Sequence, residues 1–213
     1  ILREHSPEKA LKLMAERGIL SAIYPAFVFG DRAARAVESA LVGELPPHDP
    51  ALDRVDLAWH TIAAFIPLAE LPEWTERLMF GKTMTDSLTD AAQLVQTPGA
   101  LLDEHAPASQ ITAYLENKIL DVKGDMALIA AQLCLDDSTA RDHLENFRTQ
   151  WRATRPTTTG ETLKTLGLKP GRCYGIILNR LRAARLDKEI TTDSAEHALL
   201  DDLIGKGICR DDT

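Results

Sequence analysis

The stretch TGETLKTLGLKPGRCYGIIL, residues 159–178, contains the capping and turn residues typical of two short helices joined by a tight turn. Its opening Thr-Gly pair can cap a helix that reaches Leu166. Gly167 then permits a left-handed backbone conformation that residues with a Cβ resist. Pro170 sets the backbone for the start of a second helix, whose apolar spacing continues to about Leu186. The sequence therefore predicts two short helices joined by a Gly-Leu-Lys-Pro-Gly turn.

The second of these helices is predicted to have two different faces. Its core face on a helical wheel carries Tyr174, Ile177, Leu178, Leu181 and Ala184. Its opposite face carries Arg172, Gly175, Asn179 and Arg182, with Arg180 on the flank. At the start of such a helix, free N–H groups and the helix dipole attract an anion, and Lys169 with Arg172 would add two full charges. The alternative is a tight corner between helices, in which the glycines serve packing alone.

The rest of the chain is also typical of helices. Leu- and Ala-rich segments of about 8 to 16 residues are separated by turn and capping residues, and we find neither strand-like alternation nor a fixed-period repeat. The segment Arg-Pro-Thr-Thr-Thr-Gly, residues 155–160, is the clearest boundary. We therefore expect an all-α fold, an irregular array of short helices. A larger helical body domain would occupy residues 1–154, and a small helical tail domain with the GLKPG turn would occupy residues 155–213.

Charge is distributed unevenly over the 213 residues. Residues 1–151 contain 13 Lys or Arg and 23 Asp or Glu, residues 152–190 contain nine and three, and residues 191–213 contain two and six. A basic island thus lies within a chain whose net charge is −8. This asymmetry favours contact with a polyanion in one region. The alternative is a solvated basic helix face that pairs with the acidic body.

The composition excludes several classes of protein. With 45% hydrophobic residues the chain can bury a core, and with 5% aromatic residues it does not resemble a β-sandwich or barrel. No run approaches the roughly 18 apolar residues of a membrane span. The chain opens on Ile1 without Met or a signal-like apolar core, so we expect a piece of a longer, cytoplasmic protein. Cys134, Cys173 and Cys209 are far apart and odd in number, which argues against a disulfide framework or a structural zinc site.

The tail carries a pattern similar to that of a known family. The pattern is GxxLxxLGLKPGxxYGxIL at residues 160–178, followed by ARLDxEITT at residues 184–192. It resembles the C-terminal region of bacterial tRNA nucleotidyltransferases and poly(A) polymerases, above all the long members in which CBS and phosphoesterase-type domains precede the polymerase head. The likeness is strong over residues 155–204. Upstream it is weaker, where the Leu- and Ala-rich helices look like the helical body of that family.

This resemblance implies a role in tRNA maturation. The parent enzyme would add CCA, part of it, or A residues to tRNA 3′ ends from CTP or ATP with Mg²⁺, and its tail would grip the tRNA phosphate backbone. We expect the phosphate contacts to come from Lys169, Gly171, Arg172, Arg180 and Arg182. The expected partners are tRNA and an upstream polymerase head of the same chain, with a second copy of the chain as a further candidate, and no membrane.

The residues of a catalytic head are not found in this sequence. The family's head carries a Gly-rich phosphate loop and a D-x-D metal pair, whereas Asp136-Asp137, Asp201-Asp202 and Asp211-Asp212 are adjacent pairs. Neighbours on a helix point about 100° apart, so they cannot share a metal as spaced carboxylates on a strand do. We therefore expect no catalytic, metal-binding or cofactor-binding residue in this chain. The Mg²⁺ and the ATP or CTP would be bound by the missing head.

The sequence leaves two other functions open. The chain can be a structural or dimerisation module whose helices pack against another protomer or the upstream domains without touching RNA. A self-contained enzyme is the third interpretation, and the sequence lacks a nucleophile–base or metal constellation for it.

Several single residues have competing interpretations. We expect His60 to be packed in the core rather than to bind a ligand. Trp74 and Trp151 are expected to anchor helices rather than to stack on bases. Three arginines near the boundary can either extend the basic surface or pair with body acids: Arg148, Arg152 and Arg155.

Overall fold

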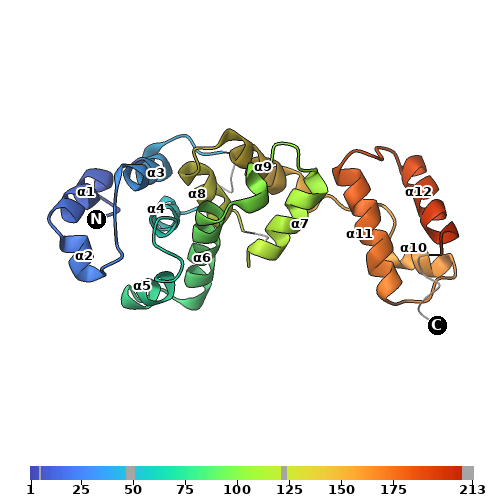
Figure 1. Cartoon of the computed structure of the whole chain (residues 1–213), viewed down its shortest axis with the longest axis horizontal. Helices are drawn as coiled ribbons and strands as arrows, with labels where there is room; N and C mark the ends of the chain where they lie inside the picture. Colours follow the sequence, from blue (N-terminus) through green and yellow to red (C-terminus); the bar gives the residue numbers. More distant parts are fainter. Residues whose placement is uncertain (5, 47–50, 121–123, 208–213) are drawn as a thin grey trace. The chain divides into compact units, whose positions relative to one another are not determined.

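The computed structural model describes residues 1–4, 6–46, 51–120 and 124–207. In this part of the chain all regular structure is helical and no strand is present (Figure 1). The helices are α1 (Pro7–Glu16), α2 (Ile19–Ile23), α3 (Asp31–Val42), α4 (Arg54–Ala63), α5 (Leu71–Arg77), α6 (Lys82–Gln96), α7 (Ala108–Lys118), α8 (Met126–Cys134), α9 (Ser138–Thr149), α10 (Gly160–Thr165), α11 (Arg172–Leu186) and α12 (Asp193–Gly205). Two 3-10 turns, η1 (Gly99–Leu102) and η2 (Trp151–Ala153), lie between them. The predicted all-α class and irregular array are confirmed.

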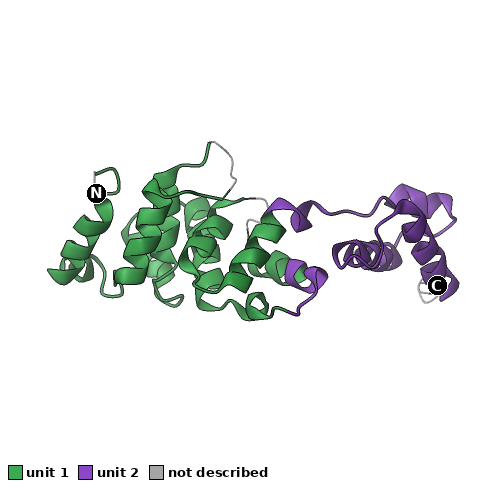
Figure 2. Cartoon of the chain, turned by 90° about the horizontal axis from the view of Figure 1, so that it is seen from above, with its two compact units in different colours: residues 1–104, 113–148 green, residues 105–112, 149–213 purple. Residues whose placement is uncertain are grey.

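The chain divides into two compact units (Figure 2). The body unit comprises residues 1–104 and 113–148, and the tail unit comprises residues 105–112 and 149–213. The division therefore falls six residues before the expected boundary at 154, and a short early segment joins the tail unit. One reason is a helix cap made over a long distance in the sequence. Asp187, just after α11, accepts hydrogen bonds from Ser109 N at 2.8 Å and Ser109 Oγ at 2.6 Å, at the start of α7.

The body unit is built around α8. This helix is buried from Ala127 to Gln132, and it packs against α3, α4 and α6. A helix that is apolar on all sides belongs in the centre of a core. The neighbouring helices contribute one apolar face each, such as Leu57 and Ile62 of α4 and Leu88 of α6, all of them inaccessible or nearly so. Burying one such side chain contributes about 1.5–3 kcal/mol.

Aromatic side chains form a cluster at one edge of this core. Trp74 has no exposed surface. Its ring centroid lies 5.5 Å from that of Phe27, 6.2 Å from that of Trp59 and 5.8 Å from that of Phe80. These edge-to-face and tilted geometries are the favourable ones for aromatic pairs. The prediction that Trp74 anchors the core rather than stacking on a base is confirmed. Trp151, in η2 of the tail unit, is half-buried.

His60 lies inside the body unit and has both ring nitrogens engaged. Nδ1 donates to the carbonyl oxygen of Asp56 at 2.7 Å, and Nε2 lies 2.8 Å from Ser87 Oγ, from which it accepts. Burial lowers the pKa of this imidazole to about 4, although the bond to Asp56 raises it slightly. His60 is therefore a neutral, packed side chain, as the sequence predicted.

We predict that this neutral histidine makes the body unit sensitive to mild acid. Its pKa is 6.5 when unperturbed and about 4 in the folded chain. Between these values the unfolded state binds a proton that the folded state does not, so stability falls as pH falls. From pH 7 to pH 4 the wild type should lose about 3 kcal/mol more than His60→Gln. Urea unfolding followed by tryptophan fluorescence in a Trp151→Phe background measures the body unit, and parallel pH curves for the two proteins would contradict the prediction.

The cysteines differ in their environments. Cys134 is a free, buried thiol in the body unit, and burial raises its pKa, so it acts as the expected small apolar filler. Cys173 is buried in the tail unit and is disulfide-bonded, so the expectation that disulfides play no part is wrong at this position. Cys209 lies outside the described residues. Within the described ranges, the apolar helices are all too short to cross a bilayer.

Candidate nucleic-acid interface

The turn between α10 and α11 is a closed helix C-cap. Gly167 has a φ of 82°, the left-handed conformation that the sequence predicts there. Gly167 N donates to Lys164 O at 2.9 Å and Leu168 N donates to Leu163 O at 3.2 Å. This pair of bonds is a Schellman motif, which satisfies the last carbonyls of α10. Because a residue with a Cβ is strained at this φ, glycine fixes where the chain leaves α10.

The core of the tail unit holds this turn against α11. Buried side chains from three helices form it: Leu163, Cys173, Ile177, Leu181, Leu200 and Leu203. The predicted core face of α11 is therefore correct, with Tyr174 and Leu178 half-buried at its edge. Tyr174 Oη donates to the carbonyl oxygen of Leu168 at 2.8 Å, which ties the turn to the first turn of α11. The segment that follows, residues 169–172, is exposed.

The structure separates the five predicted contact residues into two groups. Lys169 and Arg172 are exposed, and within the described ranges neither is paired with a carboxylate. Gly171 lies between them and is exposed, but its φ of 176° is extended backbone that any residue adopts. The other two have local partners: Arg180 forms an ion pair with Glu189 at 2.6 Å, and Arg182 Nε donates to Thr154 O at 2.9 Å. The charge of Arg180 is thus offset locally.

The exposed face of α11 also contains a glycine that packing does not require. A Cβ added at Gly175 would have no atom within 4 Å. Glycine in a helix interior costs about 1 kcal/mol relative to alanine. The alternative interpretation, in which the glycines serve packing alone, does not account for Gly175, which leaves backbone open to solvent about one turn after Arg172.

A groove lies beside this face, between the segment 155–159 and α11. Its volume is about 380 Å³, and it is lined by Arg155, Pro156, Thr158, Thr159, Leu178, Asn179 and Arg182. Arg155 Nη1 donates to Thr154 O at 2.8 Å, so this carbonyl oxygen accepts from both guanidinium groups of the groove. Of the arginines near the boundary, Arg155 thus extends the basic surface. Arg148 instead pairs with Glu145 at 2.7 Å and Asp125 at 3.3 Å in the body unit.

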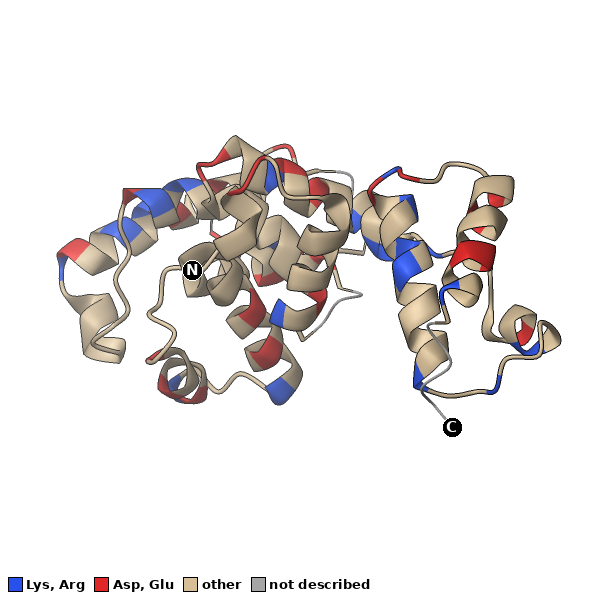
Figure 3. Cartoon of the chain, turned by 45° about the vertical axis from the view of Figure 1, so that its right-hand side comes forward, with Lys and Arg blue, Asp and Glu red and all other residues tan. Residues whose placement is uncertain are grey.

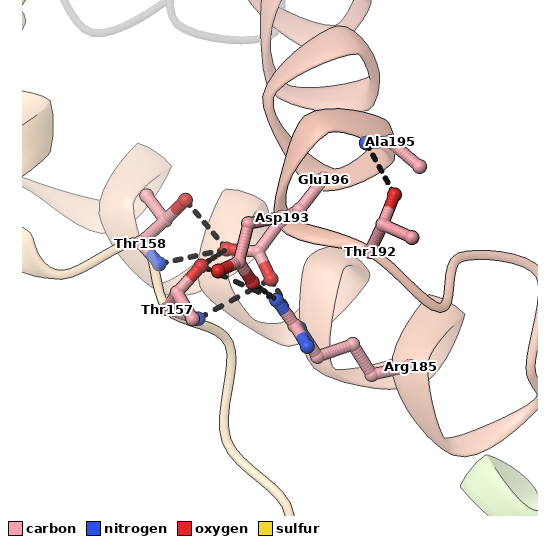
Figure 4. A network of polar contacts seen from close by, with 7 residues as sticks. All are labelled: Thr157, Thr158, Arg185, Thr192, Asp193, Ala195 and Glu196. Atoms are coloured by element: carbon pink, nitrogen blue, oxygen red, sulfur yellow. Dashed lines mark hydrogen bonds and ion pairs between the residues drawn. The ribbon is translucent and has the colours of Figure 1, made fainter.

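A buried carboxylate holds the wall of this groove in place (Figure 4). Glu196 of α12 has no exposed surface. It accepts from Thr158 N and Thr158 Oγ1, both at 2.7 Å, from Thr157 N at 3.2 Å and Thr157 Oγ1 at 3.0 Å, and from Arg185 Nε. Arg185 also pairs with Asp193 at 2.6 Å. One side chain thus joins the segment before α10 to both long helices of the tail unit.

The hydrogen bonds outweigh burial in setting the ionisation of Glu196. Burial alone raises the pKa of a carboxyl group, but donors from Thr158, Arg185 and Thr157 favour the charged form and lower the pKa to about 2. Glu196 is therefore a carboxylate at neutral pH. Neither Glu196 nor the helix α12 that carries it was predicted from the sequence. The available signal was Thr192, whose side chain caps α12 by accepting from Ala195 N at 3.2 Å, followed by acids in the first turn.

The two long helices of the tail unit carry charges of opposite sign (Figure 3). Helix α11 carries four arginines and no acid, whereas α12 carries four acids and neither Lys nor Arg. Arg180 and Arg185 pair with acids within the tail unit, which differs from the pairing with the acidic body in the alternative interpretation. Among the described residues, Lys169 and Arg172 at the turn and Arg155 at the groove are exposed cations without a carboxylate partner.

Neither a protein-family model nor a curated protein or solved structure matches this chain. Among the described residues, no group of three or more His, Cys, Asp and Glu side chains is arranged to hold a metal ion. What the tail unit offers chemically is a set of positive charges and hydrogen-bond donors at an exposed corner.

Proposed function

We propose that this chain is an RNA-binding helical region that positions tRNA for a nucleotidyltransferase acting on the tRNA 3′ end. The observation that carries the proposal is the corner at residues 169–172, where Lys169 and Arg172 are exposed and, among the residues that the structure describes, have no carboxylate partner. Contacts of this kind, to phosphate oxygens, fix the register of a nucleic acid without reading its sequence. That is the requirement for a region that must hold many different tRNAs.

The local structure supports such a contact in two ways. The Schellman cap at Gly167 and the bond from Tyr174 to Leu168 hold the corner rigidly, so little ordering cost accompanies binding. The missing side chain at Gly175 lets a phosphate approach the helix backbone beside Arg172. The charge of Arg172 and the uncapped start of α11 act in the same direction on an anion there.

The test is tRNA binding by the full chain with Lys169→Ala and Arg172→Ala combined. Each lost phosphate contact is worth on the order of 1 kcal/mol, so the affinity at low salt should fall by about 30-fold. The control combines Lys164→Ala and Lys206→Ala, which removes the same charge from residues paired with Glu161 and Asp202. If both double variants bind tRNA alike, the corner is not the contact surface.

Sedimentation distinguishes the proposed function from the alternative, a structural or dimerisation module without RNA contact. It predicts that the mass of the chain rises with protein concentration and does not change when tRNA is added. The proposal made here predicts a complex with tRNA whose formation depends on Lys169 and Arg172.

A further inference from the structure

The groove beside α11 is a second feature of the tail unit, distinct from the corner. Neither Lys169 nor Arg172 lines it. Its volume of about 380 Å³ lies in the range of small-molecule sites rather than of packing defects. Its lining combines two guanidinium groups, an exposed amide at Asn179 and the apolar side chains of Pro156 and Leu178.

The two guanidinium groups converge on a neutral acceptor. Arg155 donates to the carbonyl oxygens of Arg152 and Thr154, both at 2.8 Å, and is otherwise exposed. Arg182 donates to the same Thr154 oxygen, so the two bonded nitrogens lie within about 6 Å of each other. The carbonyl partners of Arg155 satisfy donors without neutralising its charge, and its guanidinium has five N–H groups. An anion at the groove can therefore take a charge-assisted bond from Arg155.

The other lining groups suit a nucleobase. Pro156 and Leu178 are half-buried and offer apolar surface, while the exposed Asn179 amide offers one acceptor and two donors. An amide of this kind pairs with the polar edge of a base. In a duplex those edges and faces are occupied, so the nucleotide that fits is an unpaired one, as in most recognition of RNA bases in loops, bulges and ends.

Hydrogen bonds hold one wall of the groove in place. Thr158, one of its lining residues, is buried and donates two hydrogen bonds to Glu196, from its N–H and from its hydroxyl, both at 2.7 Å. Thr159 beside it is held by a capping box with Thr162. A rigid wall lowers the ordering cost of binding.

We infer that this groove binds a single unpaired nucleotide of an RNA strand, with the base against Pro156 and Leu178, the base edge on Asn179 and the phosphate on Arg155. The inference rests on the proposed function, because it assumes that the tail unit meets RNA. It adds a contact that depends on a free base, whereas the corner depends only on the phosphate backbone.

The experiment compares two RNA probes on the full chain: single-stranded hexaadenylate and a fully paired 12-base-pair RNA duplex. Combining Arg155→Ala with Asn179→Ala should weaken hexaadenylate binding about tenfold and leave duplex binding within twofold. Combining Lys169→Ala with Arg172→Ala should weaken both. Lys206→Ala is the charge control, and amide exchange of α10–α12 checks that the tail unit stays folded.

The outcomes distinguish a nucleotide-binding groove from a general basic surface. Loss of hexaadenylate binding alone supports the groove, and equal loss on both probes shows a general basic surface and overturns it. If the Arg155→Ala, Asn179→Ala variant binds hexaadenylate as the wild type does while the Lys169→Ala, Arg172→Ala variant binds it more weakly, the inference about the groove is wrong but the proposed function stands. If the wild type binds no RNA, both are wrong. Hexaglutamate that binds as tightly as hexaadenylate would assign the groove to an acidic peptide. In the wild type, the side-chain amide signal of Asn179 should shift on adding hexaadenylate, and an unmoved signal contradicts the inference.

Discussion

Replacing Glu196 with Gln is expected to lower the free energy of unfolding of the tail unit by about 3–5 kcal/mol. The substitution keeps the volume of the side chain but removes the charge that Arg185 Nε meets in a fully buried site. It also places an NH₂ group among donors, because Thr157 and Thr158 both donate to this side chain. The loss of this charge leaves Arg185 with Asp193 alone as its ionic partner, and the buried donors of Thr157 and Thr158 lose a charged acceptor, which costs more than the loss of one bond.

Amide hydrogen exchange is the suitable measurement, because it reports on α10, α11 and α12 separately from the body unit. Glu196→Gln should speed their exchange by at least about 100-fold. Glu189→Gln is the matched control, since Glu189 also pairs with an arginine of α11 but is about half exposed. An exposed pair contributes only about 0–1 kcal/mol. If the two variants exchange alike, the buried carboxylate does not hold the tail unit together.

Replacing Trp74 with Ala should destabilise the body unit by about 3–5 kcal/mol. The side chain has no exposed surface and contacts three other aromatic rings, so its removal leaves a cavity that the neighbouring rings cannot fill without losing their packing. Urea unfolding followed by far-UV circular dichroism gives the difference. Val42→Ala is the control, because Val42 is 75% exposed and should change stability by less than about 0.5 kcal/mol. Similar unfolding midpoints for both variants would contradict this account of the core.

Local signals in the sequence predict most of the helices and the turn at the candidate site. Gly167 adopts the expected left-handed conformation, and Asp53, a residue type that favours helix N-caps, accepts from Val55 N at 2.7 Å at the start of α4. Residue type alone does not fix where a helix begins or how long it is. Asp31 is the first residue of α3 and pairs with Lys12 at 2.7 Å, and Gly99–Leu102 forms only the 3-10 turn η1.

The candidate site was predicted only in part, because charge pairing depends on contacts between distant residues. No pattern within α11 shows that Arg180 pairs with Glu189, whereas Arg172 pairs with no acid among the residues that the structure describes. The groove could not be predicted from local sequence, because its wall depends on hydrogen bonds from Thr157 and Thr158 to Glu196, about forty residues later in the chain. The exposed corner, in contrast, follows from residues adjacent in sequence, and for that reason the sequence located it.

The central claim is that the side chains of the corner contact phosphates, and the salt dependence of tRNA binding tests it most directly. Each phosphate contact contributes about 0.7–0.9 to the slope of the logarithm of the association constant against the logarithm of salt concentration. Between 50 and 200 mM salt, we predict that Lys169→Ala with Arg172→Ala makes this slope shallower by about 1.4–1.8 and that Lys164→Ala with Lys206→Ala does not. Parallel lines for the corner variant and the wild type would contradict the account.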